Sequence, residues 1–203
     1  MSGRSQPLLL LWCGRHLLIH FSAAALAVVF AVALRGKVSP EGFGEFRRSA
    51  GRLWPGRTPL SPPLLRAVAV AVVAGEGLVT VVLAAALLFP AVPVLVGFIG
   101  AVALLVAFTV GHAVALRRGR TVACACFGRT SKTVGPVGLV RNGLLIALGL
   151  AGLSAAVPGG GVAPGWGMLA LALAGAVGGL LLVSLEDLVG LFGTSTVGTR
   201  QAG

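Results

Sequence analysis

The chain has 203 residues, of which 57% are hydrophobic and only 10% are charged. A soluble domain is typically about 45–50% apolar and about 25% charged, so this composition excludes an ordinary soluble fold and predicts an integral membrane protein. The formal net charge of +11 comes from Lys and Arg clustered between apolar runs. That arrangement is typical of cytoplasmic loops facing anionic headgroups. It predicts membrane lipids, and no nucleic acid, as partners.

Five apolar runs are each long enough to cross a membrane. A run of about 18–26 residues, rising about 1.5 Å per residue as a helix, spans a hydrocarbon core of about 30 Å. Separate spans must satisfy their own backbone hydrogen bonds, which requires helices. The predicted spans are residues 17–34, 67–89, 91–116, 137–157 and 166–185. We expect an all-α polytopic protein, with an antiparallel four-helix transmembrane bundle and a fifth transmembrane helix.

The first run has basic residues before an Ala-rich centre, as a signal peptide does. Its apolar core is longer than usual, and Arg35, Gly36 and Lys37 follow it like a stop-transfer flank. We therefore expect a retained helix. The predicted organisation is an N-terminal segment (1–16), a four-helix membrane domain (17–157), a linker with the additional helix (158–189) and a disordered tail (190–203).

The connection after the first span predicts a short amphipathic helix in the headgroup region. Its apolar residues recur at helical spacing: Phe43, Phe46, Ala50, Leu53 and Trp54. The prolines at 55, 59, 62 and 63 are expected to break helicity before the second span. Glycines such as those at 175, 178 and 179 are expected to let spans approach closely.

The distribution of basic residues predicts an orientation. With five spans, the two long connections and the C-terminus share one face, which carries every Lys and Arg except Arg4 and Arg15. The positive-inside rule then places the N-terminus outside and the C-terminus in the cytoplasm of the cell that carries this multi-pass protein.

The sharpest chemical motif is a pair of cysteines, Cys124 and Cys126, followed by Phe127 and Gly128. Two thiols one residue apart can close a strained and easily reduced disulfide, and nearby arginines favour the thiolate. The alternatives are two small residues without a redox role, or a zinc site. Zinc prefers four ligands, and no second CxC or His pair completes such a set. No metal or other cofactor is therefore predicted.

Three polar residues near or inside the spans are candidate supporting residues. Glu76 lies deep in the second span, where a carboxylate must be protonated or paired; it is either a proton-relay acid or a polar latch between helices. His112, near the end of the third span, is the nearest candidate base for the cysteines. Arg141 opens the fourth span, where it can snorkel to headgroups or orient the cysteine segment.

These features together resemble the methylamine-utilisation protein MauE family, within the broader DoxX-like group. The resemblance covers about residues 17–157. It rests on Gly36-Lys37, the Phe-containing short helix, Glu76, the Cys124-Ala125-Cys126-Phe127-Gly128 segment and Arg141-Asn142. The family segment usually reads Cys-Gly-Cys-Phe-Gly, so Ala125 departs from it.

The resemblance implies a redox-associated membrane module that supports maturation of a disulfide-rich partner. In the family, that partner is the β subunit of methylamine dehydrogenase, on the extracytoplasmic side. The charge pattern instead places the cysteines on the cytoplasmic face. Three explanations stay open: electrons cross the bundle, the role is indirect, or the orientation is reversed.

The sequence therefore predicts a candidate thiol–disulfide oxidoreductase whose partners are a thioredoxin-like protein or a disulfide-containing client. The alternative is a non-enzymatic membrane scaffold or transport subunit. In that case Glu76 matters and the cysteines do not.

Overall fold

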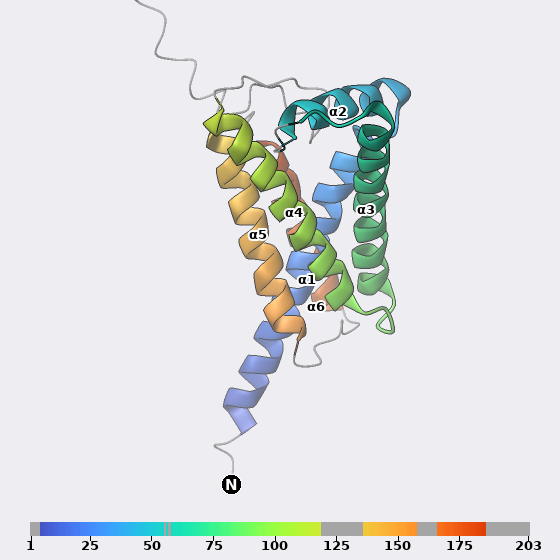
Figure 1. Cartoon of the computed structure of the whole chain (residues 1–203). Coiled ribbons are helices and arrows are strands. Elements are labelled where there is room, and N and C mark those ends of the chain that lie inside the picture. Colours follow the sequence, from blue (N-terminus) through green and yellow to red (C-terminus); the bar gives the residue numbers. More distant parts are fainter. Residues whose placement is uncertain (1–4, 55, 57, 119–135, 158–165, 186–203) are drawn as a thin grey trace, which may run out of the picture.

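The computed structural model describes residues 5–54, 56, 58–118, 136–157 and 166–185, and these residues form helices and no strands (Figure 1). The helices are α1 Ser5–Arg35, α2 Pro40–Leu53, α3 Pro62–Leu88, α4 Val94–Arg117, α5 Pro136–Ala156 and α6 Trp166–Val183. Five of them are long and apolar enough to cross a membrane. The predicted all-α polytopic fold is confirmed. Residues 158–165 of the predicted linker and the predicted tail at 190–203 lie outside the described residues.

Two helices start several residues before their predicted spans. The first helix begins at Ser5 rather than at residue 17, although its candidate span starts at Cys13. The third begins at Pro62 because Pro62 and Pro63 occupy its first positions. Proline is tolerated there, since those N–H groups have no intrahelical partner and the fixed φ suits a helix. These two prolines therefore start the helix that they were expected to precede.

Helix α1 is the central helix of the structure. Of its most apolar window, 61% is buried, compared with 11–33% for the other spans. It packs against α3, α5 and α6. Its buried residues Ile19, Leu26 and Phe30 join Leu83 of α3 and Phe98 of α4 in one hydrophobic core. The other spans therefore pack around α1 and present most of their remaining surface to the bilayer.

Helices α3, α4 and α5 alternate in direction at glycine contacts. On α4, Gly97 lies against Leu83 and Gly100 against Val79, so residue numbers on α3 fall as those on α4 rise. On α5, Gly149 and Gly152 lie against Val102 and Phe98 of α4 in the same antiparallel sense. Since α1 runs in the direction of α4, the four helices form the predicted antiparallel bundle (Figure 1).

The short helix α2 lies across one end of this bundle, beside α3 and α4 (Figure 1). Its predicted amphipathic character is confirmed, with Phe46 and Ser49 buried. Ser39 caps its start by accepting a hydrogen bond from the Gly42 N–H at 3.1 Å. The buried part of the apolar stripe therefore packs on the protein, against α3 and α4.

The fifth span, α6, packs chiefly on α1, and the two helices are parallel. A side chain at Gly175 would meet the carbonyl oxygen of Phe21, and one at Gly179 would come within 2.6 Å of that of Ala25. The contact pairs rise together along both helices, so both run the same way. Small residues four positions apart allow this backbone-to-backbone approach, as predicted for these glycines.

We predict that Gly175→Leu separates α6 from α1. The added side chain has no space against the α1 backbone, so we expect a loss of about 1–3 kcal/mol in unfolding free energy. The loss is measured as a lower Tm in detergent. Gly167→Leu is the matched control on the same helix, because a side chain at Gly167 meets nothing within 4 Å. Equal Tm values for the two variants would show that the close approach does not stabilise the fold.

Candidate functional site

A buried ion pair joins the start of the first connection to the middle of the second span. The Lys37 ammonium donates to Oε1 of Glu76, and both side chains are fully buried. Glu76 was expected to be protonated or paired, and the structure shows it paired. Removing two charges from water costs several kcal/mol per ion, so each depends on the other for compensation.

The backbone between α1 and α2 directs Lys37 into the bundle. Helix α1 ends at Arg35, and the N–H groups of Lys37 and Val38 both donate to the Leu34 carbonyl, at 2.8 and 3.1 Å. The first turn of α2 then packs so closely that a side chain at Gly42 would meet the Gly36 carbonyl oxygen. This compact turn keeps Lys37 beneath α2 rather than in solvent.

Two aromatic rings complete the surroundings of the ammonium. The Lys37 nitrogen lies 4.7 Å from the ring centroid of Phe46 on α2 and 5.3 Å from that of Phe108 on α4. Both distances suit a cation–π interaction, worth about 0.5–2 kcal/mol depending on desolvation. We call the group formed by Glu76, Phe46 and Phe108 the ammonium cage. Three helices, α2, α3 and α4, therefore converge on one cation.

Other buried polar groups lie near the same end of the bundle. His112 and Arg141 are each 4% exposed, and Asn142 is 1% exposed. Gly149 of α5 lies against Val102 of α4. Because these two helices are antiparallel, moving seven residues from that contact toward α2 brings Asn142 on α5 level with Thr109 on α4, the residue that follows Phe108. His112 follows Phe108 by one helical turn. The candidate residues Glu76, His112 and Arg141 are thus all buried in this half of the bundle.

The position of Arg141 differs from one expectation. A snorkelling arginine keeps its charged head at the membrane surface, whereas Arg141 is almost completely buried. Arg141 lies in the second turn of α5, and its side chain is enclosed there rather than exposed at the surface. Any role of Arg141 in orienting the cysteine segment stays a prediction.

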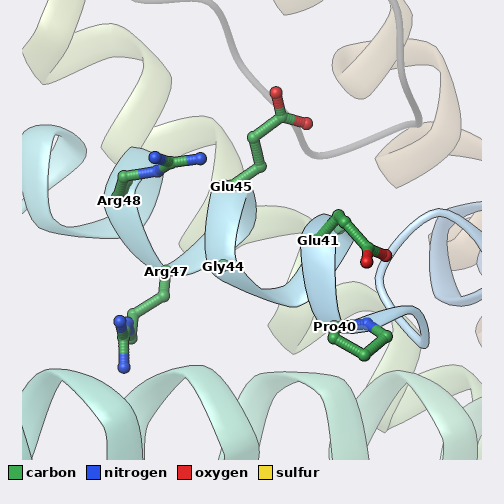
Figure 2. Close-up of a pocket in the computed structure, with 7 residues that line it drawn as sticks. Pro40, Glu41, Gly44, Glu45, Arg47 and Arg48 are labelled. Carbon is green, nitrogen blue, oxygen red and sulfur yellow. The ribbon is translucent and has the colours of Figure 1, made fainter.

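The outer surface of α2 is charged and carries a shallow hollow (Figure 2). It is lined by Pro40, Glu41, Gly42, Gly44, Glu45, Arg47 and Arg48. Glu45 and Arg47 point to opposite sides of the helix (Figure 2). The hollow is thus a feature of the exposed helix face, separate from the ammonium cage beneath α2.

The opposite end of the bundle has its own polar contacts. Arg15 of α1 donates twice to the Ala155 carbonyl near the end of α5, at 3.2 and 3.1 Å. His20 Nδ1 lies 2.7 Å from the His16 carbonyl, one turn earlier on α1. No three metal-binding side chains come together within the described ranges. The Arg15 contacts tie α1 to α5, and the His20 contact lies within α1.

The cysteine motif itself, with Cys124, Cys126, Phe127 and Gly128, lies outside the described residues. The helices flanking it are described. Helix α4 ends beside α2, where the Arg118 side chain donates to the Trp54 carbonyl at 3.3 Å. Helix α5 starts at this same end, because it runs antiparallel to α4. The two described helix ends that flank the cysteine motif therefore lie at the end of the bundle that holds the buried polar residues.

Most of the helical bundle described above matches a known protein family. The family model for the methylamine utilisation protein MauE matches residues 15–155. The chain belongs to the MauE family. The matched region covers α1 from residue 15 onward, α2, α3, α4 and all but the last residue of α5; it includes the ammonium cage and the cysteine motif and ends before α6. Searches among curated proteins and among solved structures found no significant match.

Sequence reasoning missed the importance of Lys37 in this MauE-family protein. In the sequence, Lys37 looks like one of the loop cations, because it follows a span and stands beside Gly36. The signal that pointed to it was Glu76 itself, since a carboxylate at mid-span needs a cationic partner. Lys37 is the only lysine in the described part of the chain. Pairing over 39 residues is nevertheless a tertiary property that spacing alone does not show.

We predict that the ion pair behaves as a coupled unit. Glu76→Met leaves a buried ammonium without a counterion and should cost about 3–5 kcal/mol. Lys37→Met should also destabilise, because it strands the carboxylate. The double variant removes both charges and should lose less stability than either single variant.

Unfolding free energies in detergent micelles, measured for all four chains, give the coupling energy. Glu45→Met on the exposed face of α2 is the control and should leave stability unchanged. Losses that simply add in the double variant would contradict the coupling.

Proposed function

We propose that this MauE-family membrane protein supports thiol–disulfide exchange with partner proteins through Cys124 and Cys126. The observation that carries the proposal is the CxC pair in an Arg-rich segment between two spans. Arginine near a thiol favours the reactive thiolate. In the family, the expected role is maturation of the methylamine dehydrogenase β subunit. For this chain, the broader class of disulfide-containing clients is the proposal.

The exchange needs no cofactor. A client thiolate attacks one sulfur of the Cys124–Cys126 disulfide, which forms a mixed disulfide and releases the other cysteine as a thiolate. A second client thiolate then displaces the first cysteine, leaving an oxidised client and a reduced CxC pair. The disulfide of a thioredoxin-like partner reoxidises the pair by the same two steps. Two electrons pass from client to partner.

The buried polar residues support this proposal by their location. His112 lies five residues before the last residue of α4, and Arg141 lies five residues after the first residue of α5. Both helix ends lead directly into the cysteine segment. In our proposal His112 accepts a thiol proton, Arg141 orients the segment, and Glu76 holds the helix end in place through Lys37. Phe127 and Gly128 directly follow the pair in the sequence.

We also propose that the cysteine segment faces the cytoplasm. Exposed arginines gather at the α2 end of the described structure: Arg35, Arg47, Arg48, Arg52, Arg66, Arg117 and Arg118. The opposite end contributes Arg15, which is engaged with α5. The positive-inside rule supports an outside N-terminus and a cytoplasmic C-terminus.

We predict that Cys124 and Cys126 form a disulfide in a fraction of the molecules in cells. Rapid acid quenching and alkylation with a mass-tagged maleimide would show a pool in which both thiols are protected. Cys124→Ser or Cys126→Ser should remove this pool and should accumulate mixed disulfides with partners. Cys13→Ser is the matched control, because Cys13 is exposed and unpaired in the described structure. The proposal would be contradicted if both thiols stayed reduced under every condition and the Cys→Ser variants kept the full cellular role of the protein.

We predict opposite labelling of the two ends. In variants with one cysteine each, a membrane-impermeant maleimide should label Cys13 from outside and Cys124 or Cys126 only after the cytoplasmic side is opened. The reverse pattern would place the exchange site outside, which is the compartment that direct oxidation of secreted clients requires.

The rival proposal is a membrane scaffold or transport subunit without redox chemistry. The buried Lys37–Glu76 pair is the observation that favours this rival proposal, because a polar latch between helices needs no cysteine. It predicts that Glu76→Gln abolishes the cellular role of the protein while Cys124→Ser and Cys126→Ser leave it intact. The exchange proposal predicts loss in all three variants.

A further inference from the structure

The ammonium cage has the chemistry of a binding site for a cation. A carboxylate accepts one N–H bond from the Lys37 ammonium, while two aromatic faces lie 4.7 and 5.3 Å from the nitrogen. Carboxylates and aromatic rings are the groups that proteins use to recognise ligand cations. Here the bound cation is the end of a side chain of the same protein.

The cage also has an acceptor that Lys37 leaves unused. Glu76 Oε2 is buried and has no hydrogen-bond partner among the residues that the structure describes. Buried carboxylate oxygens normally have a partner, so a free one indicates a place for a further N–H or O–H donor. The site therefore offers two accepting oxygens on one side and two ring faces on others.

We propose that Glu76, Phe46 and Phe108 form a binding site for small protonated primary amines, which Lys37 fills as a tethered internal ligand. The proposal is independent of the cysteines and of thiol exchange. A primary ammonium carries three N–H donors, enough to engage both oxygens of Glu76. A quaternary ammonium has no N–H donor and satisfies neither oxygen, although it can contact the rings.

The geometry of the turn determines when the site is available. Lys37 lies only two residues beyond the end of α1, and Ser39 caps α2 immediately afterwards. Such a short tether gives the lysine a high effective concentration, so free amines compete poorly while the turn is closed. Phe46 belongs to α2 itself. A free amine and the Lys37 ammonium would occupy the same place between Glu76 and the two rings, so the binding of one excludes the other.

The test is chemical rescue of Lys37→Ala, which removes the ammonium and leaves space for its replacement. The full-length variant is purified in detergent at neutral pH with ethylammonium, methylammonium or tetramethylammonium chloride. We expect ethylammonium to raise the Tm by about 3–6 °C at ten times its dissociation constant. Methylammonium should act in the same direction, and tetramethylammonium should have no effect beyond that of sodium chloride.

Three controls separate binding in the cage from a general salt effect. Lys37→Ala combined with Glu76→Gln lacks the carboxylate and should show no rescue. Lys37→Met fills the space with an uncharged side chain and should also show none. The unaltered chain should show no Tm shift at amine concentrations that rescue Lys37→Ala, because its own lysine occupies the site.

Each result of these measurements either supports amine binding in the cage or contradicts it. If Lys37→Ala is too unstable to purify alone, the yield of monodisperse protein becomes the readout, and ethylammonium in all buffers should restore it where tetramethylammonium does not. The absence of amine-specific rescue in Tm or in yield would overturn the proposal. So would equal rescue of the variant that also carries Glu76→Gln.

Discussion

The buried carboxylate of Glu76 is the constraint on which this end of the bundle depends. A charge at this depth requires a counterion, and Lys37 supplies it from a turn between two helices. To deliver the ammonium, α1 ends at Arg35 and α2 begins at Pro40, after only four intervening residues. Phe46 then brings α2 down over the pair, and Phe108 brings in α4. One electrostatic requirement thus positions four helices of the family module.

Much of the fold could be predicted from composition and spacing. The five spans, the amphipathic stripe of α2 and the close-packing glycines of α6 are local patterns, and local patterns are what a sequence displays directly. The partner of Glu76 could not be read in this way, because Lys37 looks like any other loop cation. The burial of Arg141 was missed for the same reason: which side of a helix end is covered depends on neighbours distant in sequence. The cysteine motif is visible in the sequence alone, because its two thiols lie one residue apart.

The family match and the packing describe two layers of organisation. Residues 15–155 contain the antiparallel bundle, the ammonium cage and the cysteine motif. Helix α6 adds to this module by covering α1, the helix that already has the most buried surface. Along α1, the buried polar residues His16, His20 and Ser22 are separated from Lys37 and the cage end by the wholly apolar stretch 23–34.

The parallel pairing of α1 with α6 also affects how the protein is made. Helix α1 leaves the ribosome well before α6, yet the backbones of Phe21 and Ala25 pack against Gly175 and Gly179. During synthesis, this side of α1 must therefore face lipid or the insertion machinery until α6 has entered the membrane. The entry of α6 is thus the step that encloses this side of the central helix.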